Sequence, residues 1–274
     1  MQKDFPRIIS AIVMILVVIG LVFLGPKALF IMLILVGGFV FDELQINFIK
    51  GKRSSIAYLI SFLIFITPLL LIFFINEQKI FSNLLLVHFC LLMNIGLLIY
   101  LFLPLNSKFK ITQALKKYPY GIGAYVFLNI FSLTHLFFHP NWWQLLTVLL
   151  FITYGMDTGA WFIGKNFGKN KLWPSVSPNK TIEGLFGGML FAGVLGGGSF
   201  HFVFGKFFVS QFFVFCLFGA VSQLGDLLQS KIKRESGIKD SSNLIPGHGG
   251  VFDRVDSLFF LTPFYLVLVQ YYLA

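Results

Sequence analysis

The chain has 274 residues, of which 57% are hydrophobic and only 12% charged, about half the charged fraction of an ordinary soluble domain. So few polar side chains cannot cover a water-facing surface, which excludes a soluble enzyme, a disordered chain and a disulfide scaffold. We therefore predict an integral membrane protein. The net charge of +10 comes from basic residues between apolar runs. There they are expected to set orientation and meet anionic lipid or nucleotide phosphates, not nucleic acid.

The apolar runs predict an all-α, polytopic protein with about nine transmembrane helices. A spanning helix needs about 20 apolar residues, and the second run is short unless it extends through Leu44 to Ile46. The first run follows basic residues as in a signal peptide, but it is long and no small-residue cleavage site follows it. The candidate spans are 8–24, 28–41, 56–75, 80–103, 119–138, 142–163, 182–204, 207–229 and 255–273.

The basic residues predict how these spans are oriented. With the N-terminus in the cytoplasm, 18 of the 21 lysines and arginines lie in inside segments. Only Lys27, Lys79 and Lys206 fall outside. This bias is the positive-inside pattern of membrane proteins, and it places the C-terminus outside.

Polar residues divide the chain into a scaffold, residues 1–140, and a catalytic region, residues 141–274. The notable acids of the first half are Asp42 and Glu43, at the inner end of the second span. We expect both to be solvated at the membrane interface, without a role in the site.

Acidic residues gather in the second half, toward the predicted cytoplasmic face. Intramembrane acids are costly and usually mark a functional site. The alternative is that each acid pairs with a nearby lysine or arginine, which lowers the cost of inserting the acid into the membrane. These acids are Asp157, Glu183, Asp226, Asp253 and Asp256. Asp253 and Asp256 share one side of a helical turn, and with Asp226 they offer the oxygen ligands that Mg²⁺ prefers.

Glycines in the same half have two interpretations. Gly184/Gly188 and Gly193/Gly197 recur at four-residue spacing, which favours close helix packing. The glycines around His248 instead lie in a polar loop that enters a helix, where backbone N–H groups favour phosphate. Two alternatives are equally open for His248: it binds phosphate or acts as an acid or base, or it has a structural role in the turn. We find neither zinc-ligand spacing nor a P-loop.

The segment 230–256, SKIKRESGIKDSSNLIPGHGGVFDRVD, resembles the signature of phosphatidate cytidylyltransferases, also called CDP-diacylglycerol synthases. Three shorter blocks agree: Asp157-Thr158-Gly159-Ala160-Trp161 with Gly164, the basic stretch 164–171, and Ser177-Pro178-Asn179-Lys180-Thr181 with Glu183-Gly184 and Gly187-Gly188. In the third block, Asn179 replaces the usual first lysine. The resemblance covers about residues 150–260.

The resemblance implies transfer of CMP from CTP to phosphatidate, giving CDP-diacylglycerol and pyrophosphate. It implies that Asp226 and Asp253 hold Mg²⁺, with a second cation such as K⁺ left open, and that Asp157 and Asp256 complete this shell. Lysines and arginines would contact phosphates: Lys180, Lys233, Arg234, Lys239 and Arg254. Ser177, Thr181, Ser230, Gly249 and Gly250 join them as substrate-binding residues, and His248 stays a candidate catalytic residue.

Other functions stay open at this point. A CTP-dependent lipid kinase, or a cytidylyltransferase for another lipid phosphate, is the nearest enzyme. A cation- or proton-coupled transporter usually has a midplane site and inverted repeats, and neither is visible here. The resemblance suggests a homodimer. No added targeting segment is seen, which favours a bacterial inner membrane with the active site on its cytoplasmic side.

Overall fold

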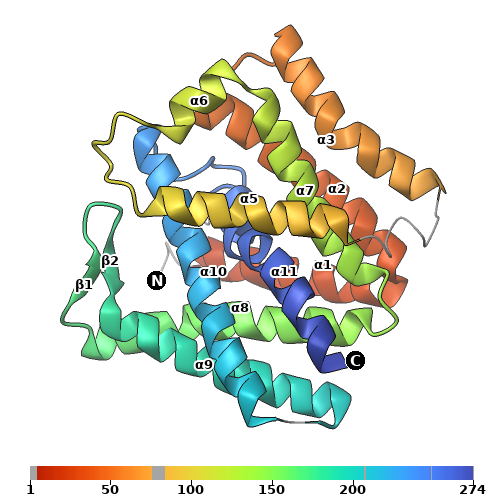
Figure 1. Ribbon diagram of the computed structural model, residues 1–274, viewed down its shortest axis with the longest axis vertical. Helices are drawn as coiled ribbons and strands as arrows, with labels where there is room; N and C mark the ends of the chain where they lie inside the picture. Colours follow the sequence, from red (N-terminus) through yellow and green to blue (C-terminus); the bar gives the residue numbers. More distant parts are fainter. Residues whose placement is uncertain (1–4, 76–83, 207, 248, 274) are drawn as a thin grey trace. The chain divides into compact units, whose positions relative to one another are not determined.

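The computed structural model describes residues 5–75, 84–206, 208–247 and 249–273, and almost all of its regular structure is helical (Figure 1). The predicted all-α class is confirmed. The helices are α1 Phe5–Leu24, α2 Pro26–Glu43, a π-helix η1 Leu44–Phe48, α3 Ile56–Ile75, α5 Leu85–Leu101, α6 Ile111–Lys117, α7 Tyr120–Phe137, α8 Trp142–Phe167, α9 Ile182–Phe204, α10 Val209–Glu235 and α11 Phe252–Leu273. The strands β1 Lys171–Trp173 and β2 Ser177–Thr181 form an antiparallel hairpin.

Within the described residues, six helical stretches are long and apolar enough to cross a membrane. They are Pro26–Phe48, Ile56–Phe74, Tyr120–Phe137, Trp142–Phe167, Ile182–Phe204 and Val209–Glu235, with shorter apolar helices at Ile12–Leu24 and Leu85–Leu101. The chain is therefore a polytopic membrane protein, and the total of nine spans stays a prediction. The second span does extend through Leu44 to Ile46, because η1 continues α2.

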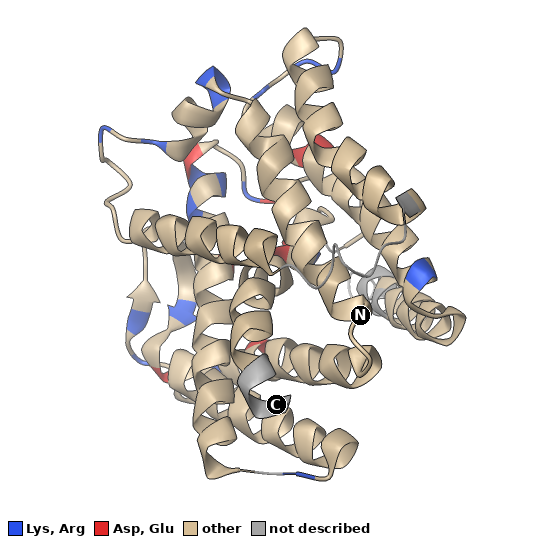
Figure 2. Cartoon of the chain, turned by 45° about the vertical axis from the view of Figure 1, so that its right-hand side comes forward, with Lys and Arg blue, Asp and Glu red and all other residues tan. Residues whose placement is uncertain are grey.

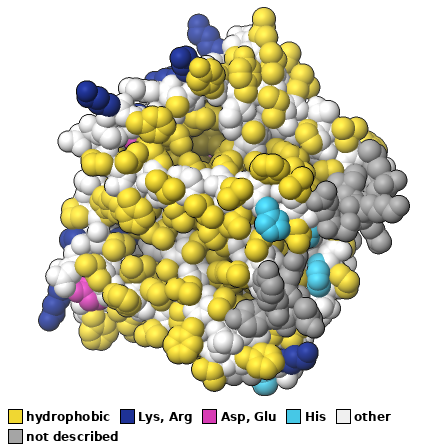
Figure 3. Space-filling model, viewed as in Figure 1, with side chains coloured by type: hydrophobic (Ala, Val, Ile, Leu, Met, Phe, Trp, Pro, Cys, Tyr) yellow, Lys and Arg dark blue, Asp and Glu magenta, His cyan; other side chains and the backbone are white. Residues whose placement is uncertain are grey.

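The surface agrees with a lipid environment. Hydrophobic side chains cover most of the face in Figure 3, and lysines and arginines lie at its margin. Most lysines and arginines lie in loops and near helix ends (Figure 2).

The chain folds into two compact units. The first comprises residues 1–90, 106–138 and 232–255, and the second comprises residues 91–105, 139–231 and 256–274. These units interleave along the chain, whereas the predicted halves, 1–140 and 141–274, divide it by function. That functional division stays a prediction.

In the first unit, aromatic side chains of α2, α3 and α7 fill the core. Phe41 stacks against Phe65 at 5.9 Å between ring centroids, and both are fully buried. Gly37 makes this packing possible, since a Cβ there would lie 2.8 Å from the Phe65 ring. At the end of α2, Asp42 accepts two hydrogen bonds from Arg53, which raise the pKa of that guanidinium.

In the second unit, α8 and α9 pack closely along their glycines. A Cβ at Gly159 would lie 2.6 Å from Phe191, and one at Gly188 would lie 2.7 Å from the main-chain oxygen of Met156. The sequence-based interpretation as packing residues is confirmed for Gly184, Gly188 and Gly193. Small residues let two membrane helices approach each other closely. The hairpin connects these two helices in the chain.

Gly188→Ala is expected to lower stability, because its methyl group would meet the backbone oxygen of Met156 on α8 as well as the flexible end of that side chain. Overpacking of this kind costs about 1–3 kcal/mol. Gly198→Ala is the matched control on the same helix, since nothing lies within 4 Å of its Cβ position. Thermal unfolding in detergent should show a lower Tm for Gly188→Ala alone. Equal Tm values would contradict the packing argument.

Lys231 lies inside the second unit, although the sequence places it among the cytoplasmic basic residues. Its side chain is fully buried, and its Nζ donates to the carbonyl oxygens of Tyr100, Leu101 and Leu103 at 2.6, 3.2 and 2.7 Å. Tyr100 and Leu101 end α5 and Leu103 follows it, and a cation at the C-terminal end of a helix is favoured by the helix dipole. Lys231 therefore fastens the C-terminal end of α5 to α10.

Candidate functional site

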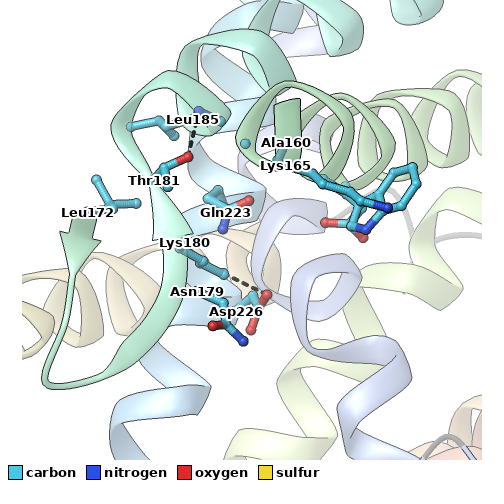
Figure 4. A pocket seen from close by; sticks show the side chains of 13 residues that line it. Ala160, Lys165, Leu172, Asn179, Lys180, Thr181, Leu185, Gln223 and Asp226 are labelled. Carbon is cyan, nitrogen blue, oxygen red and sulfur yellow. Dashed lines mark hydrogen bonds and ion pairs between the residues drawn. The ribbon is translucent and has the colours of Figure 1, made fainter. Parts of the chain in front are cut away.

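A cavity of about 550 Å³ lies within the second unit, between α8, the hairpin, α9 and α10 (Figure 4). Apart from Leu172, the residues that line the cavity come from the three shorter sequence blocks and from α10. They are Asp157, Ala160, Trp161, Gly164, Lys165, Leu172, Asn179, Lys180, Thr181, Gly184, Leu185, Gln223 and Asp226. Three predicted site residues thus share one cavity with Asp226: Asp157, Lys180 and Thr181.

Lys180 and Asp226 point toward each other across this cavity (Figure 4). The Lys180 Nζ lies 2.7 Å from Asp226 Oδ2, and the side chains are 20% and 32% exposed. Ser230 Oγ, one helical turn after Asp226, donates to Asp226 Oδ1 at 3.3 Å. Asp226 is thus oriented by two groups and remains partly open to the cavity.

The hairpin holds Lys180 at this position. Thr181 ends β2 and begins α9, where its Oγ1 accepts a hydrogen bond from Gly184 N at 3.1 Å, a standard N-cap contact. Gly164 and Gly168 leave room for the Thr181 side chain. Ser177 pairs with Trp173 in the hairpin and lies outside the cavity lining. Residue 180 is therefore fixed by both strand pairing and a helix cap.

A second polar group lies within the first unit and contains much of the 230–256 segment. Lys233 Nζ lies 2.9 Å from Asp253 Oδ1, and the two side chains are only 10% and 7% exposed. Asp253 Oδ2 also accepts hydrogen bonds from the main-chain N–H groups of Ser241 and Gly250, at 2.8 and 3.0 Å. Asp253 therefore organises the loop before α11.

Glu43 belongs to this second group, and our expectation that it is solvated is wrong. Its side chain is buried, with 2% exposure, and it accepts hydrogen bonds from Ser241 Oγ, Ser242 Oγ, Val251 N and Phe252 N at 2.6–2.9 Å. Contacts with residues about 200 positions away leave no trace in the local pattern. Asp42 is likewise paired, with Arg53 and Tyr58.

These hydrogen bonds also bear on the predicted phosphate contacts of the glycine loop. Glu43 lies at the N-terminus of α11, where an anion is favoured, and the N–H of Gly250 is bonded to Asp253. The assignment of Gly249 and Gly250 as substrate-binding residues stays a prediction. Gly249 has a φ of +85° and pairs with Ile245. His248 lies outside the described residues.

The remaining predicted residues lie outside the cavity lining. Arg234 is exposed, and its Nη1 donates to Ile238 O at 3.1 Å. Lys239 and Arg254 are exposed in the first unit. Asp256 belongs to the second unit, and its Oδ1 accepts from Ser257 N at 2.7 Å.

The comparisons with known proteins decide the family. The profile of the cytidylyltransferase family matches residues 5–272, nearly the whole chain. The chain belongs to the cytidylyltransferase family.

Three relatives are named phosphatidate cytidylyltransferase. The protein of Haemophilus influenzae is 47% identical over 126 residues, which are 44% of this chain and 44% of that protein. The Bacillus subtilis protein is 40% identical over 121 residues (43% and 44%), and that of Staphylococcus aureus strain COL is 44% identical over 119 residues (41% and 44%). The matched stretch thus spans less than half the length of each relative.

The cation site of this family member stays a prediction. Among the described residues, no three His, Cys, Asp or Glu side chains gather as a metal centre. Asp226 belongs to the second unit and Asp253 to the first. Within the second unit, Asp157 and Asp226 do line one cavity, and two carboxylates with space for water and phosphate suit Mg²⁺.

Sequence reasoning missed several residues of the cavity. Gln223 lies one turn before Asp226 on α10, a spacing that places both on one helix face. Lys165 lies over the Trp161 ring, with its Nζ 5.0 Å from the ring centroid, a cation–π geometry. Lys165 belongs to a block whose resemblance we noted, whereas Gln223 lies in none of the blocks, and spacing alone identifies neither as a cavity residue.

Proposed function

We propose that this chain transfers CMP from CTP to phosphatidate, giving CDP-diacylglycerol and pyrophosphate. The observation that carries the proposal is the cavity in which Asp157, Lys180 and Asp226 meet from α8, the hairpin and α10. Family membership and the names of three relatives support the same reaction.

The reaction joins two anions, so binding and charge neutralisation are the main tasks of the protein. A phosphate oxygen of phosphatidate forms a bond to the α-phosphorus of CTP, and the bond from that phosphorus to the pyrophosphate oxygen breaks. Lys165 and Lys180 lie at the cavity, where they would bind phosphates and reduce the repulsion between the reactants. Positioning and fixed charges of this kind supply most of such a rate enhancement.

The attacking group needs no strong general base. A phosphate monoester has a second pKa near about 6, so phosphatidate is largely doubly ionised at neutral pH. The carboxylates of the cavity are therefore assigned to binding and orientation. Asp226, held by Lys180 and Ser230, is the best-positioned of them.

Asp157 and Asp226 would hold Mg²⁺ in this cavity, and Asp253 is proposed as a further ligand by resemblance. When bound, Mg²⁺ neutralises charge on the reacting and leaving phosphate oxygens. Lys180 lies against Asp226, so this lysine would balance the carboxylate and then bind phosphate. A second cation such as K⁺ and a homodimer are proposed on resemblance alone.

The inner membrane, with the active site on its cytoplasmic side, is the proposed location. The positive-inside pattern supports this orientation. CTP would then enter from the cytoplasm, while the acyl chains of phosphatidate stay in the bilayer.

Label tracing tests the proposal. Detergent-purified protein is incubated with phosphatidate, Mg²⁺ and CTP labelled at either the α- or the γ-phosphate. We expect α-label in the lipid and one pyrophosphate released for each labelled lipid. If γ-label enters the lipid and CDP is released, the protein is a lipid kinase. If neither label enters any lipid phosphate, the proposed reaction is wrong.

A further inference from the structure

Glu43 accepts four hydrogen bonds within the first unit, and the proposed chemistry does not use it. It lies where α2 passes into the π-helix η1, and such π-helical turns often occur at functional sites. Its four hydrogen-bond donors belong to the segment 241–252, which we call the signature loop.

The contacts hold both ends of the signature loop. Glu43 Oε1 accepts from Ser242 Oγ at 2.6 Å and Val251 N at 2.8 Å. Glu43 Oε2 accepts from Ser241 Oγ at 2.9 Å and Phe252 N at 2.8 Å. Each oxygen thus joins the beginning of the loop to the start of α11. Hydrogen bonds from N–H groups to an ionised carboxylate are among the stronger ones in proteins.

Two further features fix the same segment. Asn47, one turn beyond Glu43, donates through Nδ2 to Ser241 O at 2.6 Å. Gly250 lies so close that a Cβ there would collide with Ser241 Oγ and lie 2.7 Å from Glu43 Oε1. A side chain at position 250 is therefore incompatible with this arrangement.

Ser241 links Glu43 to Asp253. Its Oγ lies 2.9 Å from Glu43 Oε2 and 3.0 Å from Asp253 Oδ2. A hydroxyl has one hydrogen to donate, so it serves one carboxylate at a time. The Ser241 N–H also donates to Asp253 Oδ2, at 2.8 Å. Any shift of Ser241 therefore displaces a donor of Asp253.

We propose that Glu43 is a positioning residue, which fixes the signature loop and, through Ser241, orients the Asp253 carboxylate for the transfer reaction. This inference rests on the proposed function for its catalytic consequence. The anchoring of the loop can be measured without activity. It also assigns a functional role to the half of the chain that the sequence presents as scaffold.

Glu43→Gln tests this role with little change of shape. The amide nitrogen that replaces one carboxylate oxygen cannot accept a hydrogen bond. The two donors that this oxygen held therefore lose their acceptor. We expect faster hydrogen exchange at the amide of Val251 or at that of Phe252, whichever of the two loses its acceptor oxygen. We also expect kcat to fall by about 10- to 100-fold, as when outer-shell partners of a site are removed, with little change in KM for CTP.

Asp42→Asn is the matched control. It makes the same chemical change at the neighbouring residue, whose carboxylate accepts hydrogen bonds from Arg53 and Tyr58. Its exchange at the signature loop and its kcat should stay near those of the unchanged protein. Should Glu43→Gln fail to fold, Ser242→Ala removes one of the four hydrogen bonds and should change exchange and kcat in the same direction, to a smaller extent.

Two results would overturn the inference. Faster exchange with normal kcat would show that the anchor does not serve the reaction. Lower kcat with unchanged exchange would show that Glu43 does not act through the loop. If the unchanged protein makes no CDP-lipid, the proposed function fails, and the exchange measurement still decides whether Glu43 anchors the loop.

Discussion

Asp226→Asn is expected to reduce CMP transfer by at least about 10²–10³-fold, the size of effect seen when one preorganised electrostatic group is removed. The substitution keeps the size of the side chain and removes its charge. Lys180 then loses its partner at 2.7 Å, and the cavity loses the carboxylate proposed to hold Mg²⁺. The measurement is the initial rate of α-label transfer from CTP into lipid, at saturating CTP and phosphatidate.

Asp42→Asn is again the matched carboxylate-to-amide control. It removes the ion pair between Asp42 and Arg53, which lies outside the cavity lining. It should keep transfer within about twofold, since exposed ion pairs contribute at most about 1 kcal/mol. Both variants should insert and elute from a sizing column like the unchanged protein. Near-normal transfer by Asp226→Asn would refute the role given to this carboxylate.

Lys233→Met is expected to destabilise the protein by about 3–5 kcal/mol, because it leaves the buried carboxylate of Asp253 without its cation. The two side chains are only 10% and 7% exposed, so water cannot replace the lost partner. The measurement is the change in free energy of unfolding, from denaturant titration in detergent.

The double variant Lys233→Met/Asp253→Leu separates stability from activity. Replacing both members of a buried ion pair by apolar residues is often neutral for stability, so the double variant should regain much of the loss. It should remain inactive, because Asp253 is a proposed ligand of the reacting groups. An active double variant would contradict that role, and an unaltered stability of Lys233→Met would contradict the burial argument.

The sequence predicts the long helices well, because a stretch of apolar residues with the length of a membrane span leaves few alternatives. The expected spans 56–75 and 182–204 coincide with α3 and α9. The hairpin of β1 and β2 was not predicted. Its strands have three and five residues, too short for a clear alternation of apolar and polar positions.

Asp226 and Lys180 were predicted as site residues, and the structure pairs them. Glu43 was missed for a physical reason. An acid at the end of a membrane span is usually solvated, and only the fold brings the signature loop, about 200 positions later in the chain, to its carboxylate. The same holds for Lys231, whose carbonyl partners on α5 lie about 130 positions earlier.

The measurement that tests the account most directly is protection of the cavity by CTP. Trp161→Cys lies in the cavity lining, and Phe167→Cys lies outside that lining on the same helix, at positions where the native side chains are 63% and 62% exposed. The native cysteines, Cys90 and Cys216, are buried. We predict that CTP with Mg²⁺ slows modification of Cys at position 161 by a polar maleimide and leaves position 167 unaffected. Equal modification rates with and without CTP at both positions would contradict a nucleotide site in this cavity.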